Sequence, residues 1–228
     1  MAITCAFIGL GVMGYPMAGH LQQSGYATTV YNRTQAKAEQ WVQEYGGTMA
    51  ATPAAAAEGK QVVMLCVGND DDVRSVVYGE QGVLSSMTAG SILIDHTPAS
   101  AQLARELSQA ATERGILFLD APVSGGQQGA VNGVLTAMIG GDEAALEQVR
   151  EVLACYAKTM QYMGSAGNGQ LAKMVNQVCI AGVVQGLAEG LQLARKVGLD
   201  PDALIQAISQ GAAGSWQMVN RYKTMWQG

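Results

Sequence analysis

The chain begins with a glycine-rich turn that joins an apolar run to a helix-like stretch. Residues 8–14 read Ile-Gly-Leu-Gly-Val-Met-Gly, a G-x-G-x-x-G pattern. Gly9 allows a tight strand-to-helix turn, Gly11 lets the backbone approach a pyrophosphate, and Gly14 lets the helix pack closely on the strand. Because free N–H groups at a helix N-terminus favour negative charge, this order predicts a dinucleotide site, with Leu10, Val12 and Met13 in the same loop. The alternative is a glycine-rich turn in an unrelated α/β protein.

Strand-like and helix-like patterns alternate from residue 2 to about residue 162, which predicts a mainly parallel sheet covered on both faces. We assign this Rossmann-type dinucleotide-binding domain to residues 1–164. The predicted strands are Thr4–Ile8, Ala27–Tyr31, Gln61–Cys66, Ser91–Asp95, Leu117–Asp120, Leu135–Ile139 and Thr159–Tyr162. The predicted helices are Pro16–Ser24, Gln35–Tyr45, Pro53–Ala57, Asp70–Tyr78, Ala99–Arg114 and Asp142–Tyr156.

The pattern changes after Gly164, where a turn cluster precedes a long stretch without proline or turn residues. With Asn168 as its N-cap, the stretch from Gln170 to Val197 predicts a helix of roughly 28 residues. Apolar residues occupy more than one of its faces, which predicts burial between two domains or against a second subunit. Residues 165–228 are therefore expected to form an all-α domain. It is too small to cover this helix, so we expect it to be incomplete.

Composition and charge narrow the function classes. The formal net charge is −5 and no basic run occurs, which argues against nucleic-acid binding. We find no uninterrupted apolar stretch of roughly 18 residues and no signal peptide, so no membrane span is expected and a cytoplasmic location is favoured. The four cysteines lack metal-ligand spacing, so we expect reduced thiols and no metal site. They are Cys5, Cys66, Cys155 and Cys179.

The residues after the second predicted strand bear on the choice of nucleotide. An acidic residue usually holds the ribose 2′-hydroxyl of NAD at this position, but the chain reads Tyr31-Asn32-Arg33-Thr34. Arg33 can pair with a 2′-phosphate, and Asn32 and Thr34 can donate hydrogen bonds to it. This predicts a preference for NADP(H) over NAD(H). If Arg33 is only a solvated loop residue, both nucleotides would be accepted.

Two later segments carry candidate chemistry. Ser124, Gly125 and Gly126 follow a strand end, where they can form an anion-binding nest for a substrate carboxylate; a purely structural turn is the alternative. Lys173 lies in the first turns of the apolar helix, with Asn176 and Gln177 on the same face. Burial can bring a lysine pKa toward working pH, which suits proton transfer to a carbonyl. The alternative is a lysine that extends to the surface.

Together these segments resemble the β-hydroxyacid dehydrogenase family, which includes 3-hydroxyisobutyrate dehydrogenase. The matching stretches are Gly9–Leu21, Asp120–Gly126 with Gly129, Ala130 and Gly133, Met138–Gly141, and Gly167–Asn176. The resemblance implies a Rossmann domain followed by a helical domain, with Lys173 as catalytic acid/base and residues 124–126 on the substrate carboxylate. It also implies that Cys66, Val67, Gly68 and Thr97 line the nicotinamide side.

The segment from Asn32 to Thr34 resembles the NADPH-preferring glyoxylate/succinic semialdehyde reductase branch. Three features depart from the family pattern. Gln177 stands where the family usually has Asn, Pro98 stands where it often has Thr, and a further lysine near the cofactor lies in C-terminal helices that this chain does not contain.

The expected reaction is reversible hydride transfer between NADP(H) and a small hydroxy acid, semialdehyde or 2-keto acid, with Asn176 or Gln177 orienting the carbonyl. A homodimer or homotetramer formed through the helical domain is expected. The alternatives are a related imine reductase and a non-catalytic NADP-binding oligomerisation module. For His96, which follows a predicted strand near the cofactor, we favour a structural role.

Overall fold

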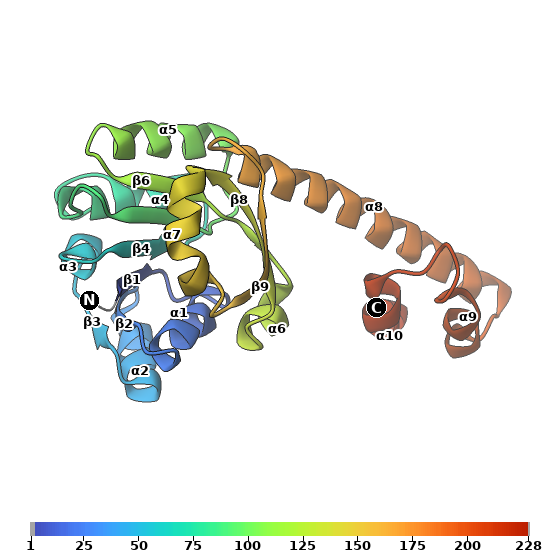
Figure 1. Ribbon diagram of the computed structural model, residues 1–228. Helices are drawn as coiled ribbons and strands as arrows, with labels where there is room; N and C mark the ends of the chain where they lie inside the picture. The colour runs from blue at the N-terminus through green and yellow to red at the C-terminus, as the bar shows by residue number, and fades with distance from the viewer. Residues whose placement is uncertain (1–2, 228) are drawn as a thin grey trace. The chain divides into compact units, whose positions relative to one another are not determined.

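The computed structural model describes residues 3–227 (Figure 1). The chain divides into two compact units, Met1–Lys173 and Met174–Gly228. The division falls inside one long helix, α8 (Asn168–Val197), nine residues after the boundary at residue 164 expected from the change in sequence pattern. The first unit is an α/β domain and the second is helical.

The sheet of the first unit is mainly parallel. Its parallel part runs in the order β3-β2-β1-β4-β5-β6, and β8 then pairs antiparallel with β6. The short strand β7 pairs antiparallel with β8, and β9 pairs parallel with it. The strands are β1 (Thr4–Ile8), β2 (Ala27–Tyr31), β3 (Thr48–Met49), β4 (Val62–Leu65), β5 (Ile92–Asp95), β6 (Leu117–Asp120), β7 (Val123–Ser124), β8 (Leu135–Gly141) and β9 (Ala157–Tyr162).

The strand order reverses at β1, which lies between β2 and β4. In open parallel sheets, ligands bind outside the carboxyl ends of the strands at such a reversal. The predicted mainly parallel sheet is therefore confirmed, and it places the glycine-rich turn after β1 at the expected binding position. The strands β3 and β7 were not predicted, because two residues are too few to show an alternating pattern.

Helices cover both faces of this sheet, as the sequence predicted. Cys5 and Phe7 of β1 face a core shared with Met17, Trp41 and other residues of α1, α2 and α7. Ala6 and Ile8 face a second core with residues of α3, α4 and α5. The helices are α1 (Gly14–Gln23), α2 (Gln35–Tyr45), α3 (Pro53–Ala57), α4 (Asp70–Val77), α5 (Ala101–Thr112), α6 (Gly126–Val131) and α7 (Glu143–Leu153), with a 3-10 turn at Val83–Ser85. The sequence analysis did not predict α6.

The second unit contains the rest of α8 together with α9 (Pro201–Ile208) and α10 (Trp216–Gln227). Asp200 caps α9 by accepting the Ala203 N–H at 2.8 Å, and Pro201 occupies the first turn. Leu187 and Leu191 of α8 form a small core with Ile205 and Met218. The predicted long helix and the cap of the next one are therefore confirmed.

Much of α8 is exposed in the described chain, which does not support its burial between two domains, whereas burial against a second subunit stays a prediction. Val178 is 73% exposed and Val175 is 64% exposed. Beyond its buried first turn, α8 is covered along the stripe that carries Leu187 and Leu191, because α9 and α10 pack on one side of the helix. Other exposed apolar residues of α8 are Leu171, Met174, Val183, Leu193 and Val197.

The expectation that no segment is apolar enough to cross a membrane also needs correction. By length and composition alone, α8 meets the criterion for a membrane-spanning helix. The expectation was based on uninterrupted apolar residues. In α8, amides and glycines lie between the apolar side chains, but charged residues are few, so the mean hydropathy of the helix is still high. A core helix of a water-soluble protein meets the same criterion, so length and composition do not decide between the two.

Candidate active site

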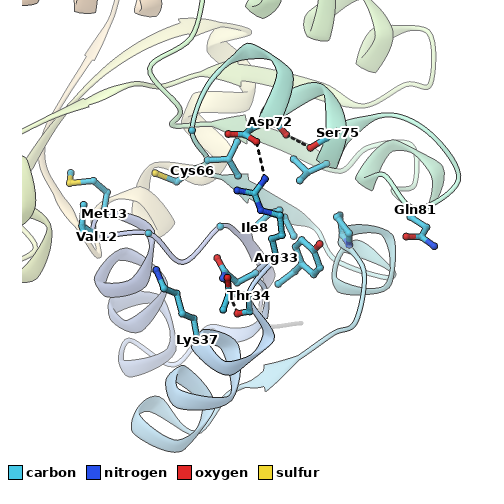
Figure 2. A pocket seen from close by; sticks show the side chains of 18 residues that line it. Ile8, Val12, Met13, Arg33, Thr34, Lys37, Cys66, Asp72, Ser75 and Gln81 are labelled. Carbon is cyan, nitrogen blue, oxygen red and sulfur yellow. Dashed lines mark hydrogen bonds and ion pairs between the residues drawn. The ribbon is translucent and has the colours of Figure 1, made fainter.

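A cavity of about 470 Å³ opens at the carboxyl ends of β1, β2 and β4 (Figure 2). It lies where the strand order reverses, and the glycine-rich turn forms one of its walls. Leu10, Gly14 and Thr97 do not line the cavity, whereas the other residues proposed from sequence for the cofactor do. Those that line it are Gly9, Gly11, Val12, Met13, Asn32, Arg33, Thr34, Cys66, Val67 and Gly68.

The three motif glycines occupy different environments. Gly9 has φ +98°, and a Cβ there would collide with the Cys66 carbonyl, so only glycine fits this turn. A Cβ on Gly14 would collide with the Gly9 carbonyl, so this glycine allows α1 to pack closely on β1. A Cβ on Gly11 would meet nothing within 4 Å. The backbone at Gly11 is therefore open to a ligand in the cavity.

The N-terminus of α1 can receive an anion. Its N-cap residue, Met13, makes no capping hydrogen bond, and the first turn contains no acidic residue. The Tyr15 N–H donates to the Gly11 carbonyl at 3.0 Å and Pro16 has no N–H, so the backbone groups open to an anion lie in the turn before the helix, where the dipole also favours negative charge. Gly11, Val12 and Met13 of this turn line the cavity. This arrangement fits a dinucleotide pyrophosphate.

Asn32 braces the glycine loop. Its Oδ1 accepts the Leu10 N–H at 2.9 Å, and its Nδ2 donates to the Thr34 carbonyl at 2.9 Å. Leu10 was predicted to lie in the cofactor loop. It is buried, so its side chain has a structural role and does not face the cavity. The sequence analysis proposed that Asn32 donates to a phosphate. The structure shows the Asn32 amide holding the loops after β1 and β2 together.

Arg33 and Lys37 supply positive charge to the cavity. The side chain of Arg33 is 86% exposed, and its Nη1 lies 3.2 Å from Asp72 Oδ1. Figure 2 shows Lys37 on the wall that also carries Arg33 and Thr34, near the glycine loop. The sequence analysis missed Lys37. The available signal was its position two residues into α2, four residues after Arg33, which brings it close to the end of β2.

Thr97 supports the cofactor loop from behind. It is fully buried, and its Oγ1 accepts the Val67 N–H at 3.0 Å. Its own N–H donates to Asp95 Oδ1 at 2.8 Å. Burial raises the pKa of Asp95 to about 7 and that of the Cys66 thiol to about 12. Thr97 was expected to line the nicotinamide side, whereas here it fixes the loop Cys66–Gly68 that does line the cavity.

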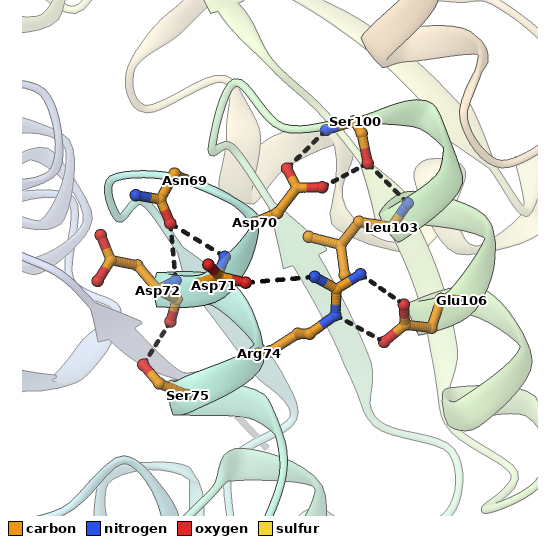
Figure 3. A network of polar contacts seen from close by, with 9 residues as sticks. All are labelled: Asn69, Asp70, Asp71, Asp72, Arg74, Ser75, Ser100, Leu103 and Glu106. Carbon is orange, nitrogen blue, oxygen red and sulfur yellow. Dashed lines mark hydrogen bonds and ion pairs between the residues drawn. The ribbon is translucent and has the colours of Figure 1, made fainter.

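The loop Cys66–Gly68 leads into Asn69, where a polar network between α4 and α5 holds the chain (Figure 3). Asn69 caps α4 by accepting the N–H groups of Asp71 and Asp72, each at 3.0 Å. Asp70 accepts the Ser100 N–H at 2.9 Å and the Ser100 hydroxyl at 2.5 Å. Arg74 pairs with Glu106 at 2.8 Å. This network joins the start of α4 to the start of α5.

Ser124, Gly125 and Gly126 lie between β7 and α6. Gly125 has φ +130° and Gly126 has φ +62°, so both adopt backbone conformations that favour glycine. Both glycines are exposed, and Ser124 is partly buried at the end of β7. Gly125 is the N-cap of α6, and among the described residues neither its N–H nor that of Gly126 donates to a backbone carbonyl. The N–H groups of this turn therefore remain available for the carboxylate contact proposed from sequence.

Asp120, at the end of β6, anchors the start of α8. Its Oδ1 accepts the Gly167 N–H at 2.8 Å, and its Oδ2 accepts the Gln170 N–H at 2.9 Å. Burial raises the pKa of Asp120, while these N–H groups act to lower it. A carboxylate is favourable at a helix N-terminus because it complements the dipole. The sequence analysis did not assign this role to Asp120.

Lys173 follows in the first turns of α8. Its side chain is partly buried, and desolvation lowers the pKa of its amine. Within residues 3–227 no carboxylate forms an ion pair with its amine. A lysine without an acidic partner and with a lowered pKa is suited to proton transfer. Asn176 and Gln177 belong to the second unit, where Asn176 Nδ2 donates to Gln177 Oε1 at 3.0 Å.

Comparison with known proteins identifies the family. Residues 4–164 match the NAD-binding domain of 6-phosphogluconate dehydrogenase, and residues 167–228 match the NAD-binding domain of NADP-dependent 3-hydroxyisobutyrate dehydrogenase. The 3-hydroxyisobutyrate dehydrogenase of Pseudomonas aeruginosa is 35% identical over 213 residues, which are 93% of this chain and 71% of that protein. The chain belongs to the 3-hydroxyisobutyrate dehydrogenase family.

Two further relatives agree with this assignment. An uncharacterized oxidoreductase of Shewanella frigidimarina is 61% identical over 223 residues, which are 98% of this chain and 77% of that protein. The solved structure of Mycobacterium tuberculosis 3-hydroxyisobutyrate dehydrogenase with L-serine has a TM-score of 0.87 and 32% identity. The match covers 97% of this chain and 74% of that one. This family member is therefore an NAD(P)-dependent dehydrogenase that acts on CH–OH groups, built from a Rossmann domain and a helical domain.

Proposed function

We propose that this dehydrogenase prefers NADP(H), reduces a small carboxylate-bearing aldehyde or 2-keto acid, and uses Lys173 as its general acid and base. In this proposal it belongs to the glyoxylate/succinic semialdehyde reductase branch. The observation that carries the proposal is the state of Lys173. Its amine is partly desolvated, its pKa is lowered, and no carboxylate among the described residues pairs with it. The helix that carries Lys173 is held at its start by the hydrogen bonds of Asp120.

The preference for NADP(H) is supported by the charges around the cavity. Arg33, Thr34 and Lys37 line it at the end of β2, where an acidic residue would be expected for NAD(H). Two cations and a hydroxyl suit a 2′-phosphate, which has about two negative charges and several strong acceptor oxygens. Acceptance of NAD(H) remains the alternative in this proposal, because the carboxylate of Asp72 already neutralises part of the charge of Arg33.

The remaining roles follow from the chemistry of the groups. A bound nicotinamide supplies the hydride for reduction and accepts it for oxidation. Lys173 as an ammonium donates a proton to the carbonyl oxygen, and its neutral amine accepts that proton in the reverse direction. Ser124 and the N–H groups of Gly125 and Gly126 hold the substrate carboxylate. Asn176 or Gln177 orients the carbonyl group.

We further propose a homodimer or homotetramer that forms through the helical unit in the cytoplasm. The apolar residues exposed along α8 support an interface, since large contiguous apolar patches on a protein surface commonly mark interaction sites. The four cysteines are free thiols in the structure, which is consistent with a reducing compartment.

A substrate panel tests the proposal. NADPH oxidation should be measured with glyoxylate, succinic semialdehyde, methylmalonate semialdehyde and tartronate semialdehyde, and serine should be tested in the oxidative direction. Butyraldehyde is the matched control for succinic semialdehyde, because it lacks the carboxylate. Turnover that depends on the carboxylate supports the proposal. Turnover of a cyclic imine alone, or tight NADPH binding without any turnover, contradicts it.

A further inference from the structure

We propose that Gln170 is a positioning residue that couples the cofactor loop Cys66–Gly68 to Lys173 through Thr97. The inference rests on the proposed function only for the role of Lys173. The coupling itself is a property of the first unit, which contains all of these residues.

Gln170 clamps the segment that follows β5. The residue is 1% exposed, and both the nitrogen and the oxygen of its side-chain amide are hydrogen-bonded. Nε2 donates to the Thr97 carbonyl at 2.7 Å, and Oε1 accepts the Ala99 N–H at 3.1 Å. The two partners lie on either side of Pro98. A buried amide with both groups satisfied in this way has a defined orientation, because rotating it would leave two buried partners unpaired.

Pro98 makes the clamped segment stiff. The proline ring fixes φ near −65° and restricts the conformation of Thr97 before it. Proline also has no N–H, so position 98 offers no competing donor to the Gln170 Oε1 that accepts the Ala99 N–H. The residue that departs from the family pattern here therefore serves as a rigid link.

Thr97 connects this segment to the cofactor loop. Its carbonyl binds Gln170, and its Oγ1 accepts the Val67 N–H at 3.0 Å. Val67 lines the cavity between Cys66 and Gly68. Thr97 is thus the one buried residue between the cofactor loop and the first turn of α8. A displacement of the loop or of the helix turn changes the geometry of a hydrogen bond at Thr97.

Gln170 also helps to fix the orientation of the first turn of α8. Asp120 holds the backbone of this turn through the N–H groups of Gly167 and Gln170. The side chain of Gln170 adds a contact with a second element, the end of β5. Lys173 lies three residues further on, and residues three apart share a helix face. Loss of the Gln170 contacts should therefore shift the Lys173 amine relative to the cofactor loop.

Hydrogen exchange of individual backbone amides tests the coupling without any turnover. Gln170→Met keeps the length of the side chain but removes both hydrogen bonds. The amide of Ala99 should exchange about three- to tenfold faster because it loses its acceptor. The amide of Val67 should also exchange about threefold faster, although its own acceptor, the Thr97 hydroxyl, is still present. Leu93 in β5 is the internal reference for global opening and should be unchanged.

Two further variants sharpen this test. Gln170→Glu keeps an oxygen that can accept the Ala99 N–H but loses the donor to the Thr97 carbonyl. It should preserve Ala99 protection and still accelerate exchange at Val67. Gln109→Met makes the same change on the exposed face of α5, where Gln109 bonds only Glu113, and it should alter neither amide. Exchange at Val67 that stays within about twofold of wild type in both Gln170 variants overturns the coupling.

Kinetics test the positioning of Lys173. In Gln170→Met, kcat should fall about 10- to 100-fold, since small misplacements of a catalytic group cost rates of this order. The Kd for NADPH should stay within about threefold of wild type. The pKa in the pH profile of kcat/KM should shift as the desolvation of the Lys173 amine changes. An unchanged kcat with an unchanged pH profile overturns the positioning role. If the wild-type chain shows no turnover at all, the proposed function fails, and the exchange at Val67 still decides the coupling.

Discussion

Arg33 reaches across the nucleotide cavity to Asp72, with Nη1 at 3.2 Å from Oδ1. Arg33 follows β2, and Asp72 lies in the first turn of α4, so the pair joins two elements that border the cavity (Figure 2). An exposed ion pair contributes only about 0–1 kcal/mol. A nucleotide phosphate can therefore displace Asp72 from Arg33, and the same carboxylate opposes a phosphate by charge repulsion.

Removing Arg33 should abolish the preference for NADP(H). We expect Arg33→Ala to raise the Kd for NADPH about 10- to 100-fold, because charge-assisted hydrogen bonds contribute about 1.5–3 kcal/mol. The Kd for NADH should change less than about threefold. A fluorescence titration with both nucleotides measures the two values. Arg114→Ala, at an exposed position after α5, is the control. Equal losses for both nucleotides would show that Arg33 does not read the 2′-phosphate.

Removing the charge of Asp72 should have the opposite effect. Asp72→Asn should lower the Kd for NADPH about three- to tenfold and leave that for NADH nearly unchanged, because it frees Arg33 and removes a repulsive charge. High salt should reduce the difference. Asp71→Asn removes the neighbouring charge, which pairs with Arg74 instead, and should have a smaller effect. Weaker NADPH binding in Asp72→Asn would instead mean that Asp72 orients Arg33 for the phosphate.

Gly169 should not tolerate a side chain. A Cβ there would lie 2.5 Å from the Met138 carbonyl oxygen and 2.6 Å from that of Asp120, both of which belong to the backbone. We expect Gly169→Ala to lower the free energy of unfolding by about 1–3 kcal/mol by pushing α8 away from β6 and β8. Gly190→Ala is the matched control on the same helix, because its Cβ would meet nothing within 4 Å. It should stabilise the helix by about 0.5–1 kcal/mol. Urea unfolding curves of both variants check this, and equal effects would contradict the packing at Gly169.

The buried carboxyl of Asp95 should make stability depend on pH. Burial, together with the smaller effects of the nearby acids Asp120 and Asp70, raises its pKa from 3.8 to about 7, against hydrogen bonds from Thr97 that act to lower it. The folded state therefore binds the proton more tightly than the unfolded state. This contribution is fully present below pH 3.8 and is lost as the pH rises through about 7.

Asp95→Asn keeps an oxygen for the Thr97 N–H and removes the charge. At pH 8 we expect its free energy of unfolding to exceed that of wild type by about 1–3 kcal/mol. Its stability should then rise between about pH 4 and pH 6.5, because burial lowers the pKa of the adjacent His96 from 6.5 to about 4. Unfolding curves across this range test the expectation, with Glu113→Gln at the exposed C-cap position of α5 as the control. A pH dependence identical to wild type would contradict it.

The sequence predicted the features that depend on local pattern. The glycine turn, the parallel strands and the start of α9 each follow from a few adjacent residues. The strands β3 and β7 have two residues each, and α6 contains two glycines, so none of them has a recognisable period. The structural role favoured for His96 is confirmed, because it is buried between the Ala121 carbonyl and the Tyr156 hydroxyl at 2.7 and 2.8 Å.

The contacts that support the site could not be predicted in the same way. Asp120 binds the N–H of Gly167 across 47 positions, and Gln170 binds Thr97 across 73. Such pairs depend on tertiary packing, and a single sequence gives no signal for them. The exposure of α8 in the described chain was missed for a related reason. Its apolar faces predict burial, but the sequence pattern does not say whether the covering surface belongs to the same chain.

In the proposed mechanism, Lys173 performs the proton transfer and is not needed to hold the nucleotide. Lys173→Met should be measured for turnover of the best substrate and, in parallel, for the Kd of NADPH, with Lys158→Met at an exposed position of β9 as the control. We predict that kcat falls about 100- to 10,000-fold, as expected for the loss of a general acid, while the Kd stays within about twofold of wild type. A kcat close to that of wild type in Lys173→Met would contradict the role of Lys173 as the general acid.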